Sequence, residues 1–307
     1  MPKIDLRPTR CAICGTEGNA VEVYPANLEM RSFTPEMFSA RRQPDRIHYR
    51  IVKCGECGLV RSDPAAGPEM LAELYSRSTL EYHPEIPNLL YTYGRYLAKA
   101  ERYCGRKGSL LEIGCGNGFF LREALGHGFA EVSGVEPSVA AAEQAGPEIR
   151  KRITVGMMRE VLFDKNRFDV VCMFQTLDHM QAPAELLDEC SRVLKPGGLV
   201  LILNHDADSF SARLLGEHSP IIDIEHTFLY SIRTLTRLIE SRGFTLKEAG
   251  AAINSYSLDY LARLMPMPKA LKSAVKRVLE ITGLSRRAVS VPLGNMYLIA
   301  MKPPAGV

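Results

Sequence analysis

The 307-residue sequence has no tryptophan, no long hydrophobic run, no excess of charge of one sign and no internal repeat. Its longest aliphatic run, Leu199–Leu203, is far shorter than the ~20 apolar residues that a membrane-spanning helix needs, so no membrane span is expected. Lys and Arg total 38 against 35 Asp and Glu, a balance too even to indicate a nucleic-acid or membrane surface. The absence of a fixed repeat excludes a solenoid.

The remaining composition is that of an ordinary soluble globular protein. Hydrophobic residues make up 46% and charged residues 24%, which argues against disorder and against a fibrous repeat. The first ten residues contain no apolar stretch of the kind found in signal peptides, so we expect a cytoplasmic protein. In that compartment the eight cysteines are expected to be thiols or metal ligands and not disulfides.

Half of the cysteines form two Cys-x-x-Cys-Gly motifs before residue 60. Each two-residue gap is typical of a tight knuckle whose glycine takes a left-handed turn, and four sulfurs satisfy the tetrahedral coordination of Zn²⁺. A redox-active pair is the alternative, but a thioredoxin-like motif occurs once, at a helix start. We predict a structural zinc site, because four protein ligands leave no position for water. The predicted ligands are Cys11, Cys14, Cys54 and Cys57.

The chain divides into three predicted parts. Residues 1–64 form a zinc-ribbon module with short strands at Val21–Tyr24 and Ile47–Val52, and residues 65–104 form a helical connector. Residues 105–307 form the third and largest part. The connector carries several tyrosines that form either a lid over a ligand or half-buried packing contacts: Tyr75, Tyr82, Tyr91, Tyr93, Tyr96 and Tyr103.

From residue 105 onward, strand patterns alternate with helix patterns, which predicts an α/β fold with a parallel, doubly wound sheet. The expected strands are Ser109–Ile113, Glu131–Val135, Phe168–Phe174 and Leu199–Leu203. The expected helices are Phe119–Leu125, Val139–Ala145, Ala184–Leu194 and Ser231–Arg242. A last strand, Asn295–Met301, is predicted to close the sheet edge beside Thr245–Ala249, and Lys269–Gly283 is a basic amphipathic stretch interpreted as a solvated surface.

A glycine-rich turn links the first of these strands to the first helix. Gly114, Gly116 and Gly118 let the backbone turn sharply and approach a ligand closely. Glu136, at the end of the next strand, is placed to accept both hydroxyls of a ribose, as in sites for dinucleotides or S-adenosylmethionine. A dinucleotide fingerprint requires a further glycine at position 119, which is Phe119, so the alternating glycines favour S-adenosylmethionine.

At these motifs the sequence resembles the class I S-adenosylmethionine-dependent methyltransferases. Glu112–Gly118 matches their first motif and Gly134–Ser138 the second. Phe168–His179 matches the region of their fourth strand, and Arg192–Gly198 the turn before the fifth. The resemblance covers about residues 105–250, and Asp178 is a departure, since many relatives carry a Leu-Glu-His sequence there.

The resemblance implies a Rossmann-like sheet of seven strands and a set of cofactor-binding residues. The glycine turn and Glu112 would line the methionine end of the cofactor and Glu136 would bind its ribose, while Pro137 and Ser138 would flank the adenine. Gln175 would lie near the sulfonium, and Met157 or its neighbour Met158 would contact the adenine unless it packs in the core. The full set is Glu112, Gly114, Cys115, Gly116, Asn117, Gly118, Glu136, Pro137, Ser138, Met157 and Gln175.

Methyl transfer to a hydroxyl or carbon acid also needs a base near the open ends of the parallel strands. The candidates are His179, His205 with the adjacent Asp206, and His226. Each has a structural alternative: His179 in particular could cap its turn and order the loop.

Three functions are compatible with these features. The first is methyl transfer to a small-molecule acceptor, and the segment Ile51–Pro64 is similar to the zinc-ribbon start of a bacterial subgroup that modifies sugars, polyketides or surface polysaccharides. The second is an RNA methyltransferase whose zinc ribbon binds nucleic acid, against which the even charge and the few aromatics of the cysteine module count. The third is a non-catalytic cofactor-binding protein, against which the intact glycine turn and Glu136 count.

Overall fold

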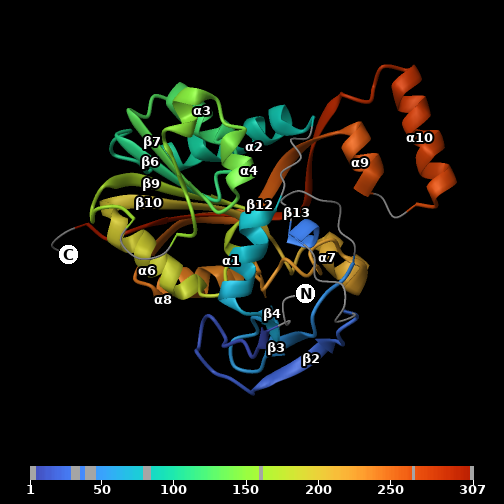
Figure 1. Cartoon of the computed structure of the whole chain (residues 1–307), viewed down its shortest axis with the longest axis horizontal. Coiled ribbons are helices and arrows are strands. Elements are labelled where there is room, and N and C mark those ends of the chain that lie inside the picture. The colour runs from blue at the N-terminus through green and yellow to red at the C-terminus, as the bar shows by residue number, and fades with distance from the viewer. Residues whose placement is uncertain are drawn as a thin grey trace.

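A central sheet organises the computed structural model, which describes residues 5–28, 35–38, 46–78, 84–158, 162–264 and 267–304. Its strand order is β12-β13-β10-β9-β6-β7-β8 (Figure 1). The strands are β6 (Ser109–Ile113), β7 (Glu131–Glu136), β8 (Ile153–Val155), β9 (Phe168–Phe174), β10 (Leu194–His205), β12 (Thr245–Ser257) and β13 (Ala288–Met301). The predicted seven-stranded α/β architecture is therefore confirmed.

Six of the seven strands run in one direction, β12 among them, and the last strand, β13, runs in the opposite direction. Strands β6 to β10 run in one direction, whereas β13 is antiparallel to both of its neighbours, β10 and β12. The predicted pairing of Asn295–Met301 with Thr245–Ala249 is confirmed, but its position at the sheet edge is wrong. Leu199 also pairs with Met301, so β13 lies between β10 and β12, and β12 forms the edge.

Helices cover both faces of the sheet because successive strand residues point to opposite sides. Val170 and Cys172 pack with Tyr96 and Phe120 on one face, where α2 (Ile86–Glu101) and α3 (Phe119–Gly126) lie. Val171 packs on the opposite face beneath two other helices. These are α6 (Pro183–Val193) and α8 (Ile232–Ser241). The short helices α4 (Val139–Glu143) and α5 (Pro147–Arg150) add Ala142 and Ile149 to the first face.

The N-terminal part forms a second sheet with the strand order β11-β4-β3-β2. Its strands are β2 (Ala20–Tyr24), β3 (Ile51–Cys54) and β4 (Val60–Ser62), joined by β11 (Phe228–Leu229) from far along the chain. Phe228 pairs with Arg61, so the segment before α8 completes the small sheet. A two-stranded pairing of β1 (Leu6–Arg7) with β5 (Ala65–Ala66) and the turn η1 (Pro35–Phe38) complete this region.

The helical connector consists of α1 (Pro68–Arg77) and α2, and its tyrosines have different surroundings. Tyr93 and Tyr96 are 3% and 1% exposed and lie in the core, so they are packing residues. Tyr91 is exposed, and Tyr82 lies outside the described residues. Tyr75, on α1, contacts a histidine described below.

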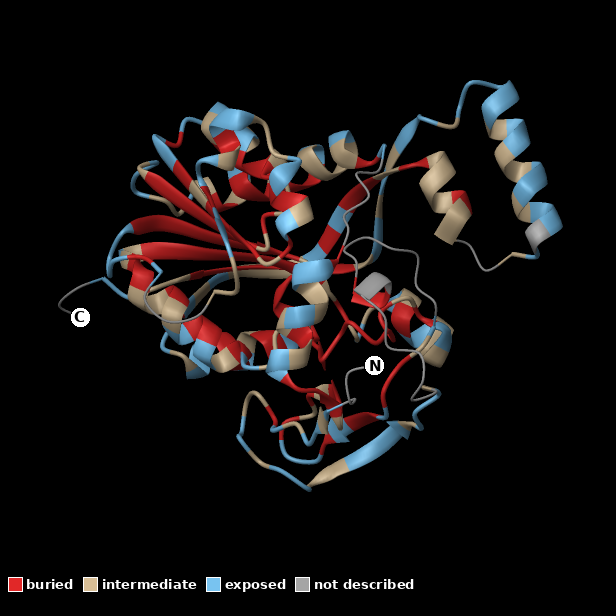
Figure 2. Ribbon diagram, viewed as in Figure 1, coloured by how far each residue is buried: buried red, intermediate tan, exposed pale blue. Residues whose placement is uncertain are grey.

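The C-terminal strands continue past the sheet as a long hairpin. The extended ends of β12 and β13 carry α9 (Leu258–Leu264) and α10 (Lys269–Ile281) away from the body of the molecule (Figure 1). Much of α10 is exposed (Figure 2). Within the described residues, no helix is both long and apolar enough to cross a membrane.

Candidate active site

The turn between β6 and α3 takes the form that its glycines predict. Gly114, Gly116 and Gly118 have φ angles of +77°, +55° and +69°, in the left-handed region that favours glycine. The amides of Gly114 and Cys115 both donate to the carbonyl of Val135, at 2.8 and 3.1 Å, which joins the turn to the end of β7. The turn is therefore held by the neighbouring strand before any ligand binds.

Glu136, the last residue of β7, faces this turn. One carboxylate oxygen accepts a hydrogen bond from the Gly116 amide at 2.8 Å, and the other accepts one from the Ser138 amide at 2.8 Å. The residue is 8% exposed. These two bonds orient the carboxylate of Glu136 toward the glycine turn.

The other predicted cofactor residues lie around the same strand ends. Glu112 is 2% exposed near the end of β6, and Cys115 is buried, with its pKa raised by burial and by the nearby Glu112 and Glu136. Asn117 Oδ1 accepts from the amide of Phe119 at 3.2 Å at the start of α3. Ser138 caps α4 by accepting from Ala141 and donates to the carbonyl of Ser78 at 2.8 Å.

Gln175 follows β9 and has a φ angle of +52°. Its Oε1 atom is buried and has no hydrogen-bond partner among the described residues, which suits a position facing a polar ligand. Pro137 and Met157 are half-buried, whereas Met158 packs against the core. This set fits S-adenosylmethionine. The glycine turn lets the backbone approach a ligand closely, the carboxylate of Glu136 lies at the end of β7, and the buried Oε1 atom of Gln175 has no partner among the described residues.

The three histidines predicted from the sequence lie together. His179 ends the turn η2 (Leu177–His179) after β9, and His205 is the last residue of β10. The ring centroids of His179 and His226 are 4.9 Å apart, and those of His205 and His226 are 5.0 Å apart. Because β10, β9 and β6 are parallel neighbours, their carboxyl ends meet at one edge of the sheet, beside the glycine turn.

Outer partners orient each imidazole through its Nδ1 atom. His226 Nδ1 lies 2.8 Å from the carbonyl oxygen of Ile221, and because a carbonyl only accepts, Nδ1 carries the hydrogen. His205 Nδ1 lies 2.9 Å from Asn295 Oδ1, and His179 Nδ1 lies 2.9 Å from the hydroxyl of Tyr75. The Nε2 atoms of His179 and His226 face Asp178.

Asp178 is the residue of this cluster that the sequence analysis did not identify as functional. Burial alone would raise its pKa, but His179, His226 and His205 hold the pKa below its usual value. Burial, with the neighbouring His226, lowers the pKa of His205 to about 4, so this imidazole is neutral. The sequence signal for it is the Asp-His pair at 178–179, where the family resemblance marks Asp178 only as a departure from the common motif.

Asp206 and the isolated cysteines make contacts that hold the fold. Asp206 Oδ1 accepts from the amide of Asp208 at 3.0 Å in the turn that precedes α7 (Phe210–Leu215), and burial raises its pKa. Cys104 is half-buried, with its thiol 2.8 Å from the carbonyl of Arg106. Cys172 and Cys190 are buried free thiols.

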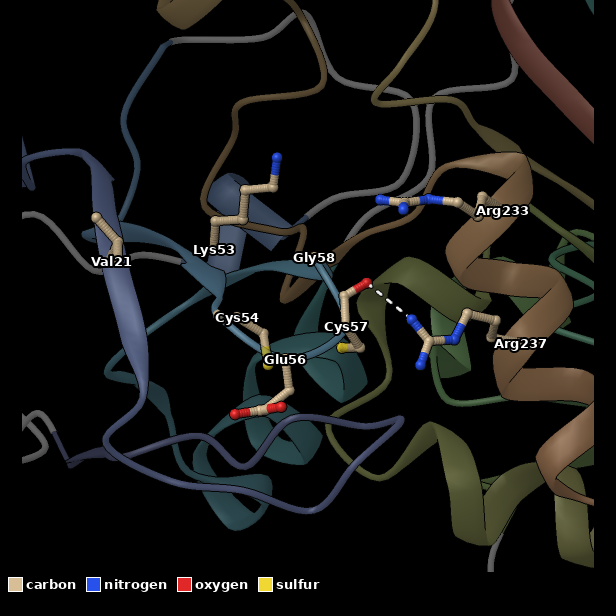
Figure 3. A pocket seen from close by; sticks show the side chains of 9 residues that line it. Val21, Lys53, Cys54, Glu56, Cys57, Gly58, Arg233 and Arg237 are labelled. Carbon is tan, nitrogen blue, oxygen red and sulfur yellow. Dashed lines mark hydrogen bonds between the residues drawn. The ribbon is translucent and has the colours of Figure 1, made fainter.

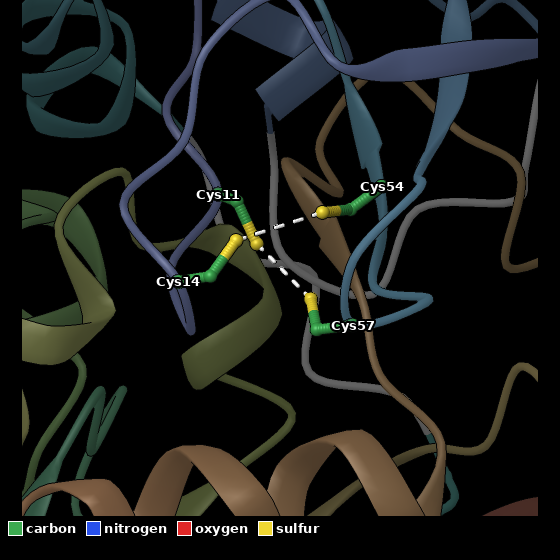
Figure 4. Close-up of side chains that lie close together, drawn as sticks. All are labelled: Cys11, Cys14, Cys54 and Cys57. Carbon is green, nitrogen blue, oxygen red and sulfur yellow. Dashed lines mark hydrogen bonds between the residues drawn. The ribbon is translucent and has the colours of Figure 1, made fainter.

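The four paired cysteines converge on one point (Figure 4). Their sulfur atoms all lie within 4.8 Å of one another, and none forms a disulfide. Gly15 and Gly58 have φ angles of +70° and +78°, as the predicted knuckles require. Burial alone would raise the pKa of Cys54, but the amides of Cys57 and Glu56 donate to its sulfur and lower the pKa to about 6. Four sulfurs at these positions fit a tetrahedral Zn²⁺ ion.

A hollow of about 330 Å³ lies beside the second knuckle (Figure 3). Lys53 lines it from β3, and Arg233 and Arg237 line it from α8. Arg237 Nη1 donates to the carbonyl of Cys57 at 3.3 Å. The contact of Arg237 joins the second knuckle to α8, which packs against the large sheet.

Comparisons with known proteins agree with this fold and site. Residues 86–249, just over half of the chain, match the family described as "Methyltransferase domain". The chain therefore belongs to this family, and the class I fold expected from the sequence is confirmed.

Among curated proteins, it is 30% identical over 160 residues to a probable S-adenosylmethionine-dependent methyltransferase of Mycolicibacterium smegmatis, covering 50% of this chain and 57% of that protein. It is 34% identical over 117 residues to the ubiquinone biosynthesis O-methyltransferase of Alkalilimnicola ehrlichii, covering 35% of this chain and 46% of that protein. The chain spans about half the length of these curated relatives.

Among solved structures, the YcgJ protein of Bacillus subtilis matches with a TM-score of 0.50 at 16% identity, over 69% of this chain and 100% of that one. This similarity shows a shared fold.

Proposed function

We propose that this protein transfers the methyl group of S-adenosylmethionine to a hydroxyl or carbon of a small-molecule acceptor. The observation that carries the proposal is the meeting of two features at one sheet edge. The glycine turn with Glu136 follows β6 and β7, and the histidine cluster with Asp178 follows β9 and β10. Gly114 and Thr176 connect the two, since a Cβ atom on Gly114 would lie 2.6 Å from the Thr176 hydroxyl.

When bound, S-adenosylmethionine supplies an electrophilic methyl group on a sulfonium. Glu136 binds the ribose hydroxyls in this proposal, and the turn from Gly114 to Gly118, with Glu112, holds the methionine end. Pro137, Ser138 and Met157 lie on the adenine side. The Oε1 atom of Gln175, which is buried without a partner among the described residues, would face the sulfonium and stabilise it by its partial negative charge.

The histidine cluster accepts the proton that the acceptor loses. A positioned base contributes about 10²- to 10⁴-fold to a rate, and a neutral imidazole is suited to this role at neutral pH. The Nδ1 hydrogens of His205 and His226 point to outer acceptors, which leaves Nε2 as the basic atom of each ring. Holding the acceptor and the methyl group together among these buried side chains supplies the remaining acceleration.

The N-terminal module has a structural role in this proposal. Cys11, Cys14, Cys54 and Cys57 bind one Zn²⁺ ion that fixes the two knuckles, and residues 1–64, 65–104 and 105–307 act as ribbon, connector and catalytic domain. Pairing of β4 with β11 places the ribbon against the segment that carries His226. The ribbon therefore supports one wall of the active site.

Two observations support a small-molecule acceptor. Relatives of this chain are named as O-methyltransferases of ubiquinone biosynthesis, the formation of a small molecule. The histidine cluster is also largely buried, since His226 is 7% exposed, and this suits a compact acceptor better than a nucleic-acid surface. A sugar, polyketide or surface-polysaccharide precursor is the proposed acceptor class.

The proposal is tested by incubating the protein with S-adenosylmethionine labelled in the methyl group and with fractionated metabolites. We expect label in a small-molecule fraction, and we expect its transfer to stop in His205→Gln but not in His218→Gln, a change at an exposed histidine. Label that enters bulk RNA and no small-molecule fraction would replace the proposal by RNA methylation.

A further inference from the structure

The carboxylate of Asp178 is buried without a hydrogen-bond partner. The residue is 1% exposed, and neither carboxylate oxygen accepts a hydrogen bond from the described residues. The closest charged or chargeable atoms are His179 Nε2, 3.7 Å from Oδ1, and His226 Nε2, 3.8 Å from Oδ2. Both distances exceed those of hydrogen bonds, and a buried carboxylate without a partner is costly.

The two imidazoles are oriented as metal ligands usually are. A histidine that binds a metal through one nitrogen almost always donates its other N–H to an outer acceptor. His226 Nδ1 donates to the carbonyl of Ile221, and His179 Nδ1 contacts the hydroxyl of Tyr75. Each ring therefore has Nδ1 fixed from outside and Nε2 directed to the carboxylate.

We infer that Asp178, His179 and His226 bind a divalent transition-metal ion. One ligand atom from each lies within 4.8 Å of the others, close enough for a single ion to bridge them after small side-chain rotations. Two imidazoles and one carboxylate suit Zn²⁺, Fe²⁺ or Mn²⁺ and leave coordination positions open. This set differs from the four thiolates in the N-terminal module, which close a tetrahedral site.

The charge around the cluster also favours a cation. Asp223 and Glu225 precede His226 in the same turn and are 3% and 9% exposed. Among the described residues, no lysine or arginine forms an ion pair with Asp178. A carboxylate buried as Asp178 is needs positive charge nearby, and a divalent ion between Asp178 and the two histidines provides it.

The inference assigns separate roles within the histidine cluster, and this assignment rests on the proposed function. An ion with open positions would bind the oxygen of the acceptor and lower the pKa of its hydroxyl, or of a carbon beside a carbonyl. His179 and His226 would then be ligands, which leaves His205 as the proton acceptor. His205 is held separately, by Asn295, whose amide nitrogen donates to the hydroxyl of Tyr256 at 3.1 Å.

The test uses the full-length protein, stripped of metal and reloaded with Co²⁺, and compares Asp178→Asn and His179→Gln with wild type. We expect two cobalt ions per chain in wild type, one with thiolate-to-cobalt charge-transfer absorption and one without it. Each variant should lose the second ion and keep the first. His218→Gln, a change at an exposed histidine, should keep both.

A wild-type protein that binds a single, thiolate-bound cobalt overturns the inference, as does a second ion that both variants retain. Binding of S-adenosylhomocysteine is measured on the same samples. If S-adenosylhomocysteine binds but no second cobalt ion does, only the metal site is refuted. If S-adenosylhomocysteine does not bind, the proposed function is refuted. If Asp178→Asn does not fold, His179→Gln decides the outcome.

Discussion

The carboxylate of Glu136 accepts a hydrogen bond from the amide of Gly116 at 2.8 Å, which joins the end of β7 to the turn between β6 and α3. Two segments twenty residues apart thereby form one surface at the carboxyl ends of parallel strands. The bond holds the glycine turn in place before a ligand arrives, so that little ordering remains to be done on binding.

Close packing behind this turn predicts a sensitive glycine. A Cβ atom on Gly134 would collide with the sulfur of Cys115, which is buried in the same core. Gly134→Ala should therefore lower the free energy of unfolding by about 1–3 kcal/mol, the usual cost of overpacking. Gly126→Ala is the matched control, because nothing lies within 4 Å of its added methyl group and alanine favours a helix. Urea denaturation measures both, and equal stability of the two variants would contradict the packing.

The assignment of His205 predicts a loss of turnover without a loss of cofactor binding. His205→Gln should lower kcat by about 10²- to 10⁴-fold, because the acceptor then keeps its proton, while affinity for S-adenosylhomocysteine stays within about twofold. His218→Gln should match wild type in both. A mutant of His205 with unchanged kcat would show that this imidazole is not the base.

Loss of zinc should destabilise the whole chain and not the N-terminal module alone. Cys11, Cys54 and Cys57 pack in the same hydrophobic cluster as Leu111 of the large sheet, so the knuckles and that sheet share a core. Cys14→Ser should release zinc and lower Tm in a single transition. Cys104→Ser is the control, since this thiol lies outside the site. Zinc content and scanning calorimetry measure the effect, and two separate transitions in wild type would contradict a shared core.

Glu248 on β12 gives the fold a predicted acid dependence. Hydrogen bonds from Lys99 at 2.5 Å and from Tyr297 at 2.7 Å lower its pKa to about 2. A carboxyl whose pKa is lower in the folded state stabilises the fold above its ordinary value of 4.5, and this contribution is lost as pH falls toward 2.

Glu248→Gln should therefore be less stable than wild type at pH 6, by less than about 1 kcal/mol because the ion pair is partly exposed. The difference should shrink as pH falls from 4.5 to 2. Glu131→Gln, at an exposed position, should show no such trend. Denaturation at several pH values measures this, and a constant difference would contradict the shifted pKa.

Local patterns were sufficient to predict much of the fold. The buried run Phe168–Phe174 and the glycine turn carry their structural requirements within a few residues, and the two cysteine knuckles repeat one short motif. The structure has these features where they were expected, because each of them depends on side chains that are close together in the sequence. By contrast, β8 has three residues and β11 has two, and strands this short show no recognisable alternation of apolar and polar residues.

Features that depend on distant contacts were not predictable. Nothing near residue 228 indicates that β11 pairs with β4, and nothing near residue 295 indicates that β13 enters between β10 and β12. The three histidines were individually predicted, but their meeting with Asp178 depends on these long-range pairings, so the unpartnered carboxylate at their centre could be recognised only in three dimensions.

Binding of S-adenosylhomocysteine, measured by calorimetry on wild type and Glu136→Gln, tests the central claim most directly. Hydrogen bonds to a charged group are worth about 1.5–3 kcal/mol each, so the variant should bind at least tenfold more weakly. Glu131→Gln, at the exposed start of the same strand, should bind as wild type does. Undetectable binding to wild type, or equal affinity of the Glu136 variant, would contradict the account.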